Sequence, residues 1–249
     1  MQSNIVSSGS GLYNNGDGTY IFKGFPTNNY IILYDDLWRI MEINNYGIKI
    51  VKVNGLSIAY DESGYRDSDS DGSAGTYCTQ HAYGCNAWAA TANLIGSPEL
   101  FVNGSYSGTV LKDSSSNIYL NGDFYINNLH KNPNIVDGVF NVGTNGNEEA
   151  YQWRGKIAII SKSDYNKSYL DNLASSYPYS YLGSLSCNNR TMFASHESTS
   201  DTIIGVICPM SNPLTYASMS MTILPVLYLN SNVTFNGEGT IDSPYTIPE

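Results

Sequence analysis

The stretch LPVLYLNSNVTFNGEGTIDSPYTI, residues 224–247, decides the fold. Its first residues, together with the preceding Ile223, form an apolar run at 223–229 that is rich in β-forming residues. Polar turn residues follow this run. A short apolar run bounded in this way predicts a strand that is buried on both faces. A turn cluster at 236–239 and a short strand at 245–247 complete the stretch. We therefore expect the rest of the chain to pack onto the strand at 223–229.

The N-terminal region predicts an antiparallel sheet, because β-rich runs there alternate with short turns. In the last of these runs Lys49 and Lys52 fall on opposite faces of the strand, among apolar residues. That imperfect alternation predicts a half-exposed meander. The four strands are expected at 19–23, 30–34, 37–43 and 48–53.

The remaining segments predict a mixture of helices and strands in a single α+β domain. No low-complexity linker divides the chain, so we expect a disordered lead at 1–10, or an artificial remnant of expression, and one domain at 11–249. The fold class expected is α+β with a mainly antiparallel sheet, about three short helices and long loops. Helices are predicted at 85–94, 116–130 and 164–174, with N-cap candidates from Ser161 onward, and further strands at 135–142, 153–160 and 202–208.

Composition excludes two classes of partner. The net charge is −10 with only 12 lysines and arginines, so neither nucleic acid nor an anionic membrane surface is an expected partner. The chain has no stretch of apolar residues long enough to insert into a membrane. Charged residues make up 14% of the chain, whereas tyrosine occurs 21 times. This composition fits a recognition surface built for adaptable hydrogen bonds, and it equally fits the codon bias of an AT-rich genome.

The four cysteines predict disulfides in an extracellular protein. Pairing Cys78 with Cys85 and Cys187 with Cys208 closes the shortest loops, although all three connectivities remain open. Free thiols in a cytosolic protein are one alternative. A zinc site made by Cys78, His81 and Cys85 is another, and it lacks an evident fourth ligand.

An acidic run predicts a possible cofactor site for calcium. Asp67, Asp69 and Asp71 alternate with serine and end at Gly72, which places several carboxylates on one side of a loop. An EF-hand loop would require glutamate at its twelfth position, which is occupied here by Cys78. The alternative interpretation is a solvated acidic loop without a metal.

Several motifs, in order, resemble a family of uncharacterised extracellular domains that is common in gut Firmicutes. The family signature reads WRI…PVIYLKS…GDGT…PYTL, and the resemblance covers most of residues 11–247. The motifs that carry it are GTYIFKG (18–24), NNYIILYDD (28–36), LWRIMEI (37–43), YGCNAWAATANLIGSPELFVNGSYSGTVLKD (83–113), YLNGDFY (119–125), WRGKIAIISKSDY (153–165) and LPVLYLNSNVTFNGEGTIDSPYTI (224–247).

The resemblance implies a C-type-lectin-like or formylglycine-enzyme-like fold on the cell surface. Members often follow a prepilin-like N-terminal helix or a signal anchor. The chain departs from the family at 223–225, where Ile-Leu-Pro replaces the more typical Val-Arg-Pro. A function carried by that arginine would therefore be absent here.

We expect a non-enzymatic adhesion or recognition module whose ligand is a glycan, a host protein or a matrix protein. The ligand region is expected in the irregular segment 188–220, because long loops on a rigid sheet commonly carry recognition. A structural subunit of a filament, assembled with pilin-like subunits, is one alternative. An enzyme of unassigned chemistry is another, although no GxSxG or phosphate-binding motif occurs. The candidate ligand residues are Asn189, Arg190, His196 and Tyr216.

The disulfide hypothesis predicts how the denatured chain reacts with an alkylating agent. Without reductant the wild-type mass should not change, and after reduction it should rise by one label for each cysteine. Cys78→Ser should expose its partner, so that one label is taken up without reduction. Labelling of the unreduced wild-type chain would reject the disulfides.

Overall fold

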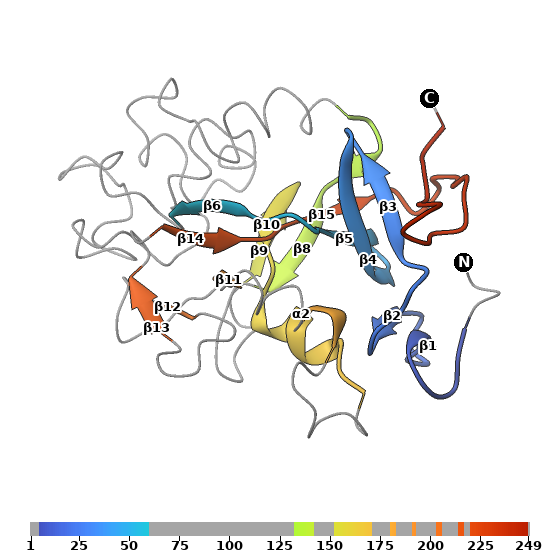
Figure 1. Ribbon diagram of the computed structural model, residues 1–249, viewed down its shortest axis with the longest axis horizontal. Helices are drawn as coiled ribbons and strands as arrows, with labels where there is room; N and C mark the ends of the chain where they lie inside the picture. Colours follow the sequence, from blue (N-terminus) through green and yellow to red (C-terminus); the bar gives the residue numbers. More distant parts are fainter. Residues whose placement is uncertain are drawn as a thin grey trace.

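The computed structural model describes residues 5–59, 132–141, 152–170, 180–182, 191–192, 203–205, 214–216 and 220–248. Their main feature is an eight-stranded sheet in the order β1-β2-β4-β5-β15-β10, with β3 paired to β4 and β7 paired to β15 (Figure 1). Every pairing in this main sheet is antiparallel. The bounds are β1 Gly11–Asn14, β2 Tyr20–Lys23, β3 Tyr30–Leu33, β4 Asp36–Asn44, β5 Gly47–Lys52, β7 Ile135–Val136, β10 Ile157–Ile159 and β15 Pro225–Leu229.

Three smaller sheets accompany the main one. In the three-stranded sheet β14 pairs in parallel with β11 and antiparallel with β6. Two antiparallel pairs, β8–β9 and β12–β13, are the others. The described residues thus form a mainly antiparallel β structure, as expected, but with less helix than the three short helices that the sequence predicted. The bounds are β6 Leu56–Ala59, β8 Gly138–Asn141, β9 Gln152–Gly155, β11 Thr191–Met192, β12 Ile203–Gly205, β13 Leu214–Tyr216 and β14 Ser220–Ile223.

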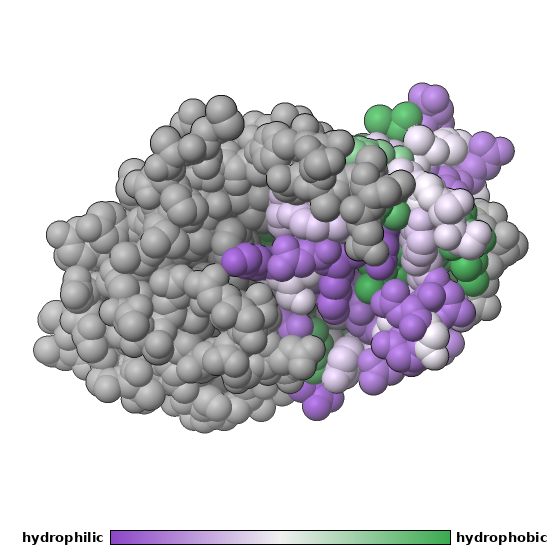
Figure 2. Space-filling view, turned by 90° about the horizontal axis from the view of Figure 1, so that it is seen from below, coloured by the Kyte–Doolittle hydropathy of each residue, from purple (hydrophilic) through white to green (hydrophobic). Residues whose placement is uncertain are grey.

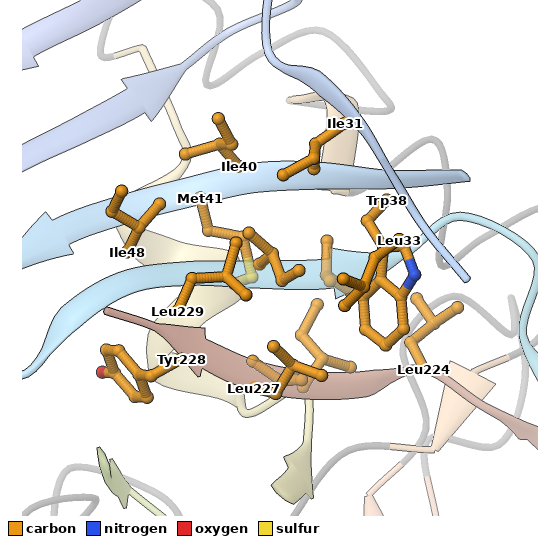
Figure 3. Close-up of a cluster of buried hydrophobic side chains, with 14 of the residues drawn as sticks. Ile31, Leu33, Trp38, Ile40, Met41, Ile48, Leu224, Leu227, Tyr228 and Leu229 are labelled. Atoms are coloured by element: carbon orange, nitrogen blue, oxygen red, sulfur yellow. The ribbon is translucent and has the colours of Figure 1, made fainter. Parts of the chain in front are cut away.

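Strand β15 lies inside the main sheet, between β5 and β10. All five of its residues are buried, as expected for 223–229, but the strand begins only at Pro225, because Leu224 separates it from Ile223 at the end of β14. Leu227 is paired with Ile50 on β5 and with Ile157 on β10, and none of these three side chains is exposed. Figure 3 shows Leu227 and Leu229 of β15 in the same apolar cluster as Trp38 and Ile40 of β4.

The expectation of a half-exposed meander at 48–53 is wrong. All six residues of β5 are buried, including Lys49 and Lys52. Each lysine meets a carboxylate: Lys49 contacts Asp164, and Lys52 contacts Asp36. The sheet is therefore covered on both faces at β5, and ion pairs make the burial of the two lysines tolerable.

Two expected strands are each divided by one residue. The strand expected at 153–160 separates into β9 and β10 around Lys156, and the strand expected at 135–142 separates into β7 and β8 around Asp137. The break lets β7 pair with β15 while β8 pairs with β9. Gly138 begins β8 directly against the ring of Tyr228, where a Cβ atom would lie 2.0 Å from the ring.

Helix α2 (Lys162–Lys167) follows β10 and lies below the sheet in Figure 1. Ser161 is its N-cap, as the sequence suggested, and forms a capping box with Asp164. The helix was expected to extend to 174, but it ends at Lys167 with Ser168 as C-cap. The helices expected at 85–94 and 116–130 lie outside the described residues. Within those residues, α2 is the one helix whose two ends are both defined.

The C-terminal segment after β15 covers the outer edge of β3. The backbone N–H of Tyr30 donates to the carbonyl of Gly239 at 2.7 Å, and that of Ile32 donates to the carbonyl of Tyr245 at 2.9 Å. Gly239 has φ +77°, and a Cβ atom there would lie 2.3 Å from the Tyr245 ring. The turn expected at 236–239 therefore helps to pair backbone N–H groups on the outer edge of β3, which would otherwise be unpaired.

Leu227→Ala should lower the free energy of unfolding by about 2–5 kcal/mol, because it opens a cavity at the centre of the sheet. Ile241→Ala is a matched control, since Ile241 is 60% exposed. The control should change stability by no more than about 0.5 kcal/mol. Urea unfolding followed by circular dichroism measures both, and equal losses would contradict the central position of β15.

Candidate functional site

Three polar side chains lie side by side on the face of the main sheet that α2 covers. Lys49 on β5 is paired with Glu42 on β4 and with Tyr228 on β15, so the three side chains share one face. Asp164, which belongs to α2 on this face of the sheet, contacts Lys49. We call Glu42, Lys49, Asp164 and Tyr228 the Lys49 cluster.

The pair at the centre of the Lys49 cluster is almost fully enclosed. The Nζ atom of Lys49 contacts Oδ1 of Asp164, and the two side chains are only 5% and 4% exposed. The other carboxylate oxygen, Oδ2, accepts hydrogen bonds from the backbone N–H of Ser161 at 3.0 Å and from its hydroxyl at 2.9 Å. The capping box of α2 therefore fixes the carboxylate while the sheet presents the lysine.

Each charge of the pair stabilises the charged form of the other, which opposes the effect of burial on both pKa values. Burial alone would raise the pKa of Asp164, but the Lys49 charge and the hydrogen bonds from Lys49 and Ser161 outweigh it and lower that pKa. Burial would likewise lower the pKa of Lys49, whereas Asp164, Tyr228 and Glu42 raise it. The two groups form an ion pair inside the protein.

Aromatic rings enclose the lysine. Its Nζ atom lies 5.6 Å from the ring centroid of Phe140 and 5.8 Å from that of Tyr228. The Tyr228 hydroxyl donates to the carbonyl of Val139 and accepts from the side-chain amide of Asn44, both at 3.3 Å. Burial raises the pKa of Tyr228, against the charge of Lys49, so this phenol stays neutral at ordinary pH.

Glu42 and Asp164, two members of the Lys49 cluster, border a small hollow next to α2. The Glu42 carboxylate accepts from the Asn44 amide at 3.2 Å and lies 3.6 Å from Nζ of Lys167. Glu42, Asp164, Lys167 and Tyr181 all line the hollow, which has room for about one water molecule. Two carboxylates therefore border the same water-sized space.

Arg39 occupies the same face of the sheet one pair further along β4. Its guanidinium lies between the rings of Tyr30 and Tyr181, 4.3 and 4.4 Å from their centroids. Its Nε atom also donates a hydrogen bond to the side-chain oxygen Oδ1 of Asn29, at a distance of 2.9 Å. Burial lowers the pKa of Arg39 and raises that of Tyr181. Arg39 therefore holds its neighbours in place rather than offering a charge to a ligand.

Most of the candidate residues expected from the sequence lie outside the described residues. Tyr216 ends β13, opposite Ile203 of β12. Within the described ranges no three His, Cys, Asp or Glu residues come together as metal ligands, and no helix is long and apolar enough to cross a membrane. The candidates outside those ranges are Asp67, Asp69 and Asp71, the cysteines Cys78, Cys85, Cys187 and Cys208, and Asn189, Arg190 and His196.

Sequence reasoning missed the Lys49 cluster. Lysines at both 49 and 52, on opposite faces of an otherwise apolar strand, were the available signal. They were interpreted as evidence of exposure. The sequence predicts Asp164 only as the start of a helix, and nothing local in the sequence places it beside a lysine 115 residues away.

Figure 2 views the molecule from the side on which α2 lies and shows a mainly hydrophilic described surface there, with small hydrophobic areas. Comparison of the chain with known protein families, with curated proteins and with solved structures finds no match. The geometry of the site and the composition of the chain are therefore the basis for interpreting its function.

Lys49→Met should lower the free energy of unfolding by about 3–5 kcal/mol, because it leaves the Asp164 carboxylate buried without a partner. Lys49→Met/Asp164→Asn should be clearly more stable than Lys49→Met, since neither charge remains buried. Lys52→Met is the matched control: its partner Asp36 is 35% exposed, so water can solvate the carboxylate. Urea unfolding compares the variants, and a double variant no more stable than Lys49→Met would contradict the importance of the ion pair.

Proposed function

We propose that the chain is a non-enzymatic, extracellular module for adhesion or recognition at a cell surface, with a C-type-lectin-like fold. Its composition supports this proposal, because tyrosine and uncharged polar residues replace the usual charges. Such side chains supply adaptable hydrogen bonds and rigid aromatic contacts at recognition surfaces. The resemblance to a family of extracellular domains supports the same location.

The connection between the candidate ligand residues and the core carries the proposal furthest. Asn189 and Arg190 come directly before β11, and β11 pairs in parallel with β14. A single residue, Leu224, separates β14 from the buried strand β15. The strand that follows these two residues in the sequence is thus connected through β14 to the core, and recognition segments commonly adjoin strands of a rigid sheet.

Calcium is a proposed cofactor of this module. Asp67, Asp69 and Asp71 would supply the carboxylate oxygens that calcium prefers. A metal held there would stiffen the surrounding loop and so reduce the entropic cost of binding a ligand. Calcium would then affect ligand affinity without taking part in any reaction.

The test is a binding screen of the full chain against glycans and matrix proteins, with calcium and with a chelator. We expect at least one specific ligand whose binding falls at least tenfold in Arg190→Ala. Arg154→Ala is the matched control, because Arg154 is an exposed arginine on β9. It should bind like the wild type.

A blank screen with folded protein would reject the recognition function. An equal loss in Arg154→Ala and Arg190→Ala would reject the assignment of Arg190. Calcium dependence that survives Asp69→Ala would reject the proposed metal residues.

A further inference from the structure

We propose that Lys49 and Asp164 condense to form an amide cross-link between β5 and α2. The pair would then be a site of self-modification, independent of any ligand that the module recognises. The product is an isopeptide bond between the lysine Nζ atom and the Cγ atom of the aspartate. Glu42 is proposed to move the protons.

The reacting groups are already in contact in a fixed arrangement. Lys49 reaches the carboxylate from the sheet, and Ser161 holds the other carboxylate oxygen with two hydrogen bonds. Both side chains are at least nine-tenths enclosed. Holding two reactants in this way can correspond to effective concentrations of order 10⁵ M or more, which no pair of free side chains reaches.

The reaction balances without any added reagent. Nζ first gives up one ammonium proton to the carboxylate, and the lone pair freed in this way forms the bond to Cγ while one bond between Cγ and a carboxylate oxygen breaks. The oxygen leaves as water with two of the three ammonium protons, and the third stays on the amide nitrogen. An ammonium and a carboxylate thus become one neutral amide and one water molecule, with no oxidation or reduction.

Glu42 is placed for the proton transfer that this reaction requires. It lies opposite Lys49 on the neighbouring strand and is only 7% exposed. It also borders the same water-sized hollow as Asp164. A water molecule in this hollow would carry protons between the carboxylates of Glu42 and Asp164, and so between Glu42 and the reacting pair. The hollow itself can hold the water that is released.

The surroundings favour the neutral product over the ion pair. Phe140 and Tyr228 exclude water from the lysine, and enclosing two charges in such a place is costly even when they are paired. Condensation removes both charges. The Lys52–Asp36 pair differs, because the Asp36 carboxylate is partly exposed and remains solvated. It is the natural comparison within the same strand.

The test is the mass of the purified full chain, measured after reduction and denaturation. We expect the wild type to be lighter than its sequence by one water molecule. After trypsin digestion, residues 40–52 should appear joined to residues 163–167, because an acylated Lys49 resists cleavage. Lys49→Met and Asp164→Ala should have the full sequence mass, whereas Lys52→Met should remain lighter. Glu42→Gln should form the link at least tenfold more slowly.

Separate peptides 40–49 and 163–167 from the wild type would overturn the proposal. A missing water that persists in Lys49→Met would also overturn it, since succinimides at Asp17-Gly18 or Asp137-Gly138 lose the same mass. The peptide map of the wild type decides the question even where a variant does not fold.

Discussion

The burial of β15 on both faces is the constraint on which the rest of the structure depends. A strand enclosed in this way needs two neighbours in the sheet and a cover above and below it. Strands β5 and β10 supply the neighbours. The apolar cluster around Trp38 fills one side, and α2 with the Lys49 cluster closes the other. The Lys49–Asp164 pair lies on the α2 side and the Lys52–Asp36 pair on the Trp38 side, so each face contains an ion pair among apolar residues.

The strands with strong local signals could be predicted from the sequence, and so could the N-cap of α2. Apolar runs such as 223–229 and the capping pattern at Ser161 act over a few residues, so their signals are visible locally. The breaks at Asp137 and Lys156 could not be predicted, because a change of pairing partner depends on distant strands. Strands β1, β6, β11 and β13 were not predicted, and β1 shows the reason: its pairing with β2 and its contacts with the core make those four residues a strand.

The Lys49 cluster shows why the polar part of the core was harder to predict than the apolar part. The sequence alone does not distinguish a buried lysine from an exposed one, because burial depends on a nearby carboxylate. For Lys49 that carboxylate is Asp164, which lies on a helix 115 residues further along the chain. Arg39 is similar, since its neighbours Trp38 and Ile40 face the apolar cluster while it faces Tyr30 and Tyr181. In both cases the periodic pattern locates the strand, and only the tertiary structure tells whether a charge is inside.

The pairing of β5 with β15 also determines the order in which the molecule can be completed. β5 is synthesised well before β15, so its partner edge stays open until residues 225–229 have emerged. Such a non-local sheet folds slowly, because a long stretch of chain must be ordered before the pairing stabilises it. Meanwhile the unpaired, apolar edge of β5 is a template for other chains. The nascent protein should therefore depend on holding factors during its synthesis far more than the finished molecule does.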